Sequence, residues 1–145
     1  MEQKLPRAAW ALGVSGLIPQ LLAAAITLHP PHAAFGQFSA FLYGALIFSF
    51  LGGLWWGVAA INPKASRWLF VVGVLPSLIA FAAGLLWIMR SGSPGQALTI
   101  VGIGLLLAPI VDRELDQRAM VPKGWLAMRT TLSVGLGILT LLAAR

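Results

Sequence analysis

The sequence predicts an all-α integral membrane protein, built as a single domain from a bundle of five transmembrane helices over residues 1–145. Of its residues, 59% are hydrophobic and only 10% are charged, whereas about 25% are charged in a typical soluble domain. The mean hydropathy is +0.87, and the apolar residues fall in long runs joined by short polar loops. Too few polar side chains remain to cover a water-facing surface, which indicates a chain that lies in a lipid bilayer.

A spanning helix needs about 20 mostly apolar residues, because the hydrocarbon layer is about 30 Å thick and a helix rises about 1.5 Å per residue. Five segments qualify: roughly Ala8 to Leu28, Phe38 to Ile61, Trp68 to Met89, Gln96 to Val111, and Leu126 to Ala144. The fourth is short, which favours little tilt or a locally thinned bilayer. The first segment also has features of a cleavable signal peptide. Of the two interpretations, we expect a helix that is retained in the protein. The joining loops are too short for a second domain.

The distribution of basic residues predicts the orientation of the bundle. With five spans, the N-terminus and the loops at 62–67 and 112–125 share one side of the membrane. Eight basic residues belong to that side: Lys4, Arg7, Lys64, Arg67, Arg113, Arg118, Lys123 and Arg129. The other side holds only Arg90 and the terminal Arg145. The positive-inside rule therefore places the N-terminus in the cytoplasm and the C-terminus outside. Because no Arg-rich transit peptide is recognisable, we expect the inner membrane of a bacterium.

Composition and motifs exclude several classes of function. Cysteine is absent, so the chain has no disulfide, no thiolate nucleophile and no cysteine-based metal cluster. The net charge of +6 does not indicate a nucleic-acid partner, because the basic residues lie between apolar runs and not in one patch. His29 and His32 lie in a turn without a further ligand, and we expect no metal and no cofactor. No catalytic motif occurs, so we expect no enzyme activity.

The run FLGGLWWGVA at residues 50–59 combines the smallest and the largest side chains. Small residues recur every four positions along this helix: Ala45, Ser49, Gly53 and Gly57. Such a face lets another backbone approach closely, so we predict that it packs within the chain, with a dimer interface as the alternative. Trp55 and Trp56 fall near the cytoplasmic end of the helix, as in an interfacial aromatic belt. Alternatively they line a pocket in which a quinone, pigment or lipid stacks.

Three prolines lie inside the predicted spans and predict helix kinks: Pro19, Pro76 and Pro109. Each removes a backbone donor and frees the carbonyl four residues earlier. An ion site at these carbonyls is not favoured, because ion pathways usually include an intramembrane carboxylate or histidine. All four acidic residues are expected at the cytoplasmic surface instead.

Asp112 is the acidic residue nearest to the membrane, directly after the fourth apolar run. Arg129 is its natural counterpart, just inside the fifth run. With Trp55 and Trp56, this pair forms the candidate ligand-binding site, at the cytoplasmic end of the bundle. The alternative is an ordinary interfacial charge pair with a snorkelling arginine.

Several segments resemble, in order, a small family of membrane proteins. They are GVSGLIPQ at 13–20, ALIFSFLGGLWWGVA at 45–59, VLPSLIAF at 74–81, then Asp112, and VPKGWLAMRTTLS at 121–133. The chain resembles the DUF3429 family, and SFLGG followed by WG is the most specific segment. The resemblance implies a compact multi-helix membrane protein and supplies no reaction.

From these observations we expect a non-enzymatic accessory or assembly subunit of a larger inner-membrane complex, respiratory or photosynthetic. Its partners would be membrane lipids and either that complex or further copies of the chain. The alternative is a small transporter, channel or carrier of lipid or quinone that uses the cytoplasmic-side pocket. A third class, an enzyme acting on lipid headgroups, lacks a nucleophile or metal beside Asp112 and Arg129.

Overall fold

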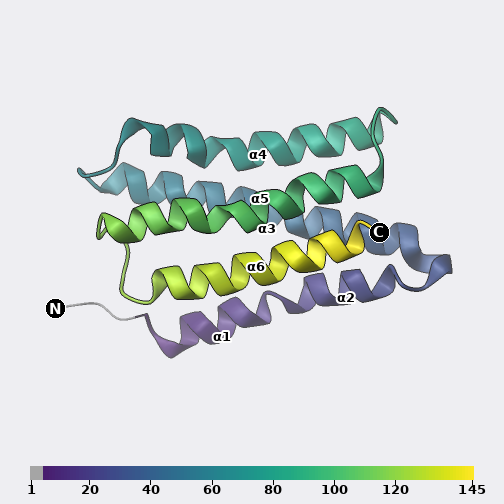
Figure 1. The fold of residues 1–145 in the computed structure, drawn as a ribbon, viewed down its shortest axis with the longest axis horizontal. Coiled ribbons are helices and arrows are strands. Elements are labelled where there is room, and N and C mark those ends of the chain that lie inside the picture. The colour runs from purple at the N-terminus through teal and green to yellow at the C-terminus, as the bar shows by residue number, and fades with distance from the viewer. Residues whose placement is uncertain (1–4) are drawn as a thin grey trace.

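The computed structural model describes residues 5–145, and its helices run lengthwise along one bundle (Figure 1). They are α1 (Arg7–Ser15), α2 (Ile18–Ile26), the short 3-10 helix η1 (Pro30–His32), α3 (Ala33–Ile61), α4 (Arg67–Ile88), α5 (Pro94–Gln117) and α6 (Trp125–Ala143). Because α1 and α2 together form one span, five segments are long and apolar enough to cross a membrane. The predicted all-α class and the predicted number of spans are confirmed.

The bundle has two ends, which are named here by the chain. At the N-terminal end α1 begins, α3 connects to α4, and α5 connects to α6; at the C-terminal end α6 stops (Figure 1). This arrangement places the loops with most of the basic residues at one end. Lys4, which belongs to the predicted basic side, lies outside the described residues. Which end faces the cytoplasm stays a prediction.

The first span is broken in its middle. α1 ends at Ser15 and α2 begins at Ile18, with Pro19 in its first turn. Proline has no N–H, so the carbonyl of Ser15 receives no helical hydrogen bond. The Tyr43 hydroxyl of α3 donates to the carbonyl oxygen of Gly16 at 2.6 Å and so satisfies one acceptor at the break. By contrast, α4 and α5 each continue past their proline without interruption.

α2 is held in the bundle by a buried amide. The Gln20 side chain is fully buried, and its Nε2 donates to Thr140 Oγ1 of α6 at 2.7 Å and to the Ala40 carbonyl of α3 at 3.2 Å. Hydrogen bonds between helices stabilise membrane bundles, because an unpaired amide in hydrocarbon is costly. α1, in contrast, contributes no buried residue.

The helices pack through close backbone contacts, as expected where lipid removes the hydrophobic drive for association. α3 crosses α4 at Gly52, where an added Cβ would overlap the carbonyl oxygen of Gly73. α5 meets α6 at Gly102 and Gly137, where an added Cβ on either glycine would lie 3.3 Å or 3.1 Å, respectively, from the carbonyl oxygen of the other. No side chain larger than hydrogen fits these crossings without a shift.

The predicted small-residue face is only partly used for this packing. Ala45 packs against the core cluster. A Cβ added to Gly53 or Gly57 would meet no described atom within 4 Å, and both glycines are exposed. The prediction of packing within the chain is therefore wrong for these two glycines. The crossing uses Gly52 instead, which lies about 100° around the helix from Gly53.

Helix α5 extends beyond the fourth predicted span. The run was expected to end at Val111, but the helix continues to Gln117 and includes 24 residues. Its buried positions Leu105, Ala108, Asp112 and Leu115 keep one helical spacing through the predicted end. Asp112 lies on the buried face of the helix and is 0% exposed, so its side chain is enclosed by the bundle. Its level relative to the cytoplasmic surface stays a prediction.

We expect Gly52→Ala to lower the free energy of unfolding by about 2–3 kcal/mol, because the methyl group would overlap the α4 backbone. The matched control is Gly53→Ala, one position along. It should be neutral or raise stability by up to about 1 kcal/mol, since alanine favours a helix over glycine. Thermal unfolding of both variants in detergent measures the difference. Equal stability of the two variants would contradict the observed crossing.

Candidate functional site

The candidate site is centred on the carboxylate of Asp112 in α5. Asp112 is fully buried, about 8 Å of helix rise before the end of α5 at the N-terminal end of the bundle. Trp55 of α3, which is 2% exposed, donates its indole Nε1–H to Asp112 Oδ1 at 3.0 Å. A donor from α3 thus satisfies one carboxylate oxygen, and the second oxygen faces α6.

Arg129 of α6 supplies the opposite charge. Its Nε lies 3.3 Å from Asp112 Oδ2, and its side chain is 7% exposed. This contact lacks the alignment of a hydrogen bond, so it acts as an ion pair. Trp125, one turn before Arg129, lies with its ring centroid 5.9 Å from Cζ, which is within the range of a cation–π contact. Helices α3, α5 and α6 therefore meet at one buried charge pair.

The pair is electrostatically balanced but strongly interdependent. Moving a single charge into an apolar interior is unfavourable by several kcal/mol, and a close opposite charge offsets much of that penalty. Removing one partner leaves the other buried and uncompensated, which typically destabilises a protein by about 3–5 kcal/mol. An ionisable residue packed inside a membrane bundle is also a marker of functional sites.

Three of the four predicted site residues come together, and the fourth does not. Trp55, Asp112 and Arg129 are in contact, as described above. Trp56 faces α4 and not the charge pair, because successive helix positions are rotated by about 100°. It is 47% exposed, and its ring makes an edge contact with Phe70 of α4, at 5.5 Å between centroids. A ligand therefore cannot stack between Trp55 and Trp56. Ligand binding by these residues stays a prediction.

The buried neutral polar residues were not predicted from the sequence. Ser133, one turn after Arg129 on α6, is 1% exposed, and its hydroxyl has no hydrogen-bond partner. Gln20 and Thr140 form the polar contact that joins α2 to α6. The signal was present in the sequence. A glutamine inside an apolar run is unusual, and a spacing of four places Ser133 on the helix face of Arg129.

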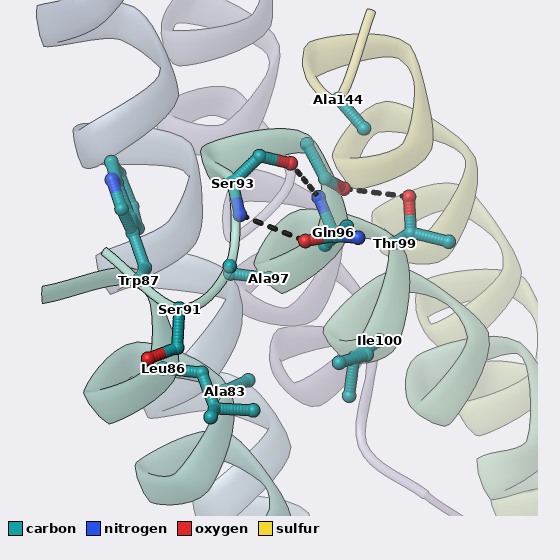
Figure 2. A pocket seen from close by; sticks show the side chains of 12 residues that line it. Ala83, Leu86, Trp87, Ser91, Ser93, Gln96, Ala97, Thr99, Ile100 and Ala144 are labelled. Atoms are coloured by element: carbon teal, nitrogen blue, oxygen red, sulfur yellow. Dashed lines mark hydrogen bonds between the residues drawn. The ribbon is translucent and has the colours of Figure 1, made fainter. Parts of the chain in front are cut away.

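A cavity of about 610 Å³ lies at the C-terminal end of the bundle, between α4 and the start of α5 (Figure 2). Three of the polar side chains that line it, Ser93, Gln96 and Thr99, already form hydrogen bonds within the first turns of α5. The backbone N–H of Ser93 donates to Gln96 Oε1, the backbone N–H of Gln96 donates to Ser93 Oγ, and the Thr99 hydroxyl donates to the Gly95 carbonyl, as the dashed lines in Figure 2 show. This is a capping box with one further helical bond. The cavity therefore carries a weaker case for a ligand than the charge pair does.

Comparison with known proteins shows a matching protein family and a similar membrane protein. A family model described as "Protein of unknown function (DUF3429)" matches residues 5–145. Transmembrane protein 69 of Xenopus tropicalis is 32% identical over 136 residues, which are 89% of this chain and 50% of that protein. The chain thus spans about half the length of this relative. No solved structure is significantly similar. The resemblance drawn from the sequence motifs is confirmed.

We expect Arg129→Leu to lower the free energy of unfolding by about 3–5 kcal/mol, because the buried Asp112 would lose the charge that compensates its own. Replacing both residues by leucine should restore most of the loss, since neither charge then remains. The measurement is a double-mutant cycle by thermal unfolding in detergent. The matched control is Arg118→Leu, which breaks the surface pair with Glu114 and should change stability by less than about 1 kcal/mol. Additive single losses would refute the interdependence.

Proposed function

Since the chain belongs to the DUF3429 family of proteins of unknown function, we propose its function from its own geometry. It is a non-enzymatic integral membrane protein that acts as an accessory or assembly subunit of a larger inner-membrane complex, respiratory or photosynthetic. The observation that carries the proposal is a face of α3 that the bundle leaves open. This open glycine face consists of Gly53, Gly57 and Ala60, all exposed.

The open glycine face is suited to a neighbouring helix. Each glycine within a helix lowers its stability by roughly 0.5–1 kcal/mol relative to alanine, so two glycines facing only lipid would weaken α3 without a packing benefit. Small residues four apart allow backbones of two membrane helices to approach closely, and van der Waals contacts then stabilise the pair. Trp56, held against Phe70, lies beside this face and offers an aromatic side wall.

The charge distribution favours a helix of a different protein over a second copy. Two copies inserted in the same orientation would bring the same α3–α4 loops together just beyond the open glycine face. Lys64 lies in this loop and Arg67 at the start of α4, and both are exposed. Like charges in close proximity repel, whereas a partner with acidic groups at this level would be attracted. A heterologous partner therefore fits the surface better.

The proposal includes an orientation and a location. Lys64, Arg67, Arg113 and Arg118 all lie in or beside the loops at the N-terminal end of the bundle. The positive-inside rule assigns such an end to the cytoplasm, so the C-terminus lies on the opposite side. We place the protein in the inner membrane of a bacterium, as a multi-pass protein.

A second candidate function is a carrier for lipid or quinone, and two observations favour it. The first span is discontinuous at Gly16 and Leu17, and discontinuous helices surround the substrate sites of many transporters. The Asp112–Arg129 pair supplies a buried charged contact that a moving headgroup could exchange. Transport would require this closed pair to open.

The accessory role is tested by crosslinking in native membranes. A diazirine amino acid at position 60, within the open glycine face, should capture one defined membrane protein, identified by mass spectrometry. The same group at position 81 on α4, where Phe81 is 70% exposed, should capture only lipid. Gly57→Leu should abolish the adduct without lowering the unfolding temperature, because position 57 is exposed and a Cβ there would meet no described atom within 4 Å.

Two outcomes would overturn the accessory role. Adducts between copies of this chain would replace the heterologous partner by a homo-oligomer. Lipid adducts alone at position 60, together with monomeric migration of the solubilised protein, would leave the open glycine face without a partner.

The carrier candidate is tested in liposomes with a fluorescent phospholipid. The wild-type protein should speed its movement between leaflets, and Asp112→Asn should abolish the effect, because the charge is lost while Trp55 still has an acceptor. Movement at the same rate with the wild-type protein, with the variant and in protein-free liposomes would remove this candidate.

A further inference from the structure

A crevice of about 210 Å³ opens beside the break in the first span. It lies between α1, α3 and α6, and its wall includes Leu12, Gly16, Tyr43, Phe50, Arg129 and Ser133. Leu12 and Phe50 are 73% and 60% exposed. The crevice is therefore open to the lipid-facing surface of the bundle and not to the loops at either end.

The floor of the crevice holds polar groups without partners. Arg129 is 6% exposed and Ser133 is 1% exposed, so both side chains are more than nine-tenths buried. Arg129 Nη2 and Ser133 Oγ are buried and make no hydrogen bond. Buried polar atoms are nearly always paired, and an exception needs a reason. Both residues line the crevice one turn apart on α6, and their unpaired donors lie just beneath its wall. A small shift of the wall would let an acceptor from outside the chain reach both donors.

The charge balance decides which kind of acceptor fits. Asp112 already neutralises Arg129 from the far side. An anionic headgroup would add a second negative charge beside this pair and leave a net charge buried in the membrane, which is unfavourable. A neutral carbonyl oxygen accepts hydrogen bonds from both donors without that penalty. The crevice therefore favours a neutral ligand.

We propose that this crevice binds the carbonyl-bearing head of a neutral lipid-soluble molecule. Arg129 and Ser133 donate to its oxygen, and the walls from Leu12 and Phe50 contact its apolar part. The volume is below the roughly 300–1,000 Å³ that encloses a drug-sized molecule, so only the head enters and the tail stays in the surrounding lipid. This inference does not depend on the accessory role, because a subunit of a complex and a carrier could each hold such a ligand.

Two sources supply this chemistry, the ring carbonyl of a quinone and the ester carbonyl of a neutral lipid, and the experiment separates them. Native mass spectrometry of the detergent-solubilised protein compares binding of decylbenzoquinone, dioleoylglycerol and oleic acid. The first or the second should bind, and oleic acid, the anionic probe, should bind more weakly.

Three variants connect binding to the crevice. Ser133→Ala should weaken binding about fivefold, the effect of one neutral hydrogen bond. The same change should leave the unfolding temperature unchanged or raise it, because it removes a buried unpaired hydroxyl. Leu12→Trp should fill the opening and weaken binding at least about tenfold, as the loss of most head contacts implies. Leu46→Trp, on an exposed part of α3 outside the crevice, should bind like the wild type.

Binding of the quinone alone or of the diacylglycerol alone supports the proposal and identifies the carbonyl. Binding that Leu12→Trp leaves unchanged would overturn it. So would preferential binding of oleic acid, or no binding of any of the three probes.

Discussion

The buried carboxylate of Asp112 is the constraint on which the N-terminal half of the bundle depends. It requires a positive charge and a hydrogen-bond donor within reach, and these come from α6 and α3 as Arg129 and Trp55. The three helices must therefore keep their relative rotation, because a turn of any one of them leaves a charge unpaired in an apolar interior.

The C-terminal half of the bundle is held by a different and weaker kind of contact. Gln20 joins α2 to α3 and α6 through neutral hydrogen bonds, and Gly102 and Gly137 let α5 and α6 approach. Neutral bonds between membrane helices contribute on the order of 1 kcal/mol each. A charge pair thus stabilises one end of the protein, and glycine packing and amide contacts stabilise the other. Substitutions at the charge pair should therefore lower the free energy of unfolding more than substitutions at the neutral contacts.

Much of the fold was predictable because a span needs a length of apolar sequence that few other structures need. The exact faces were not, since the hydropathy of a membrane helix is nearly uniform around its axis. Gly52 and Gly53 are adjacent and chemically identical, yet only Gly52 meets α4. The pairing of Asp112 with Arg129 was predicted from their proximity to the same membrane surface. Their burial was not, because the end of α5 was read from hydropathy and not from the continued spacing of its buried face.

The break in the first span also divides the protein into parts of different local stability. At Gly16 and Leu17 the regular α-helical bonding is interrupted, although Leu17 still bonds back to Val14 and accepts from Leu21, and α1 buries no residue of its own. α2, in contrast, is anchored by Gln20. Segments with few buried contacts open with low free energy while the remainder stays folded. Within the first span, α1 is therefore the part that opens more easily, and its amide hydrogens should exchange ahead of those of α2.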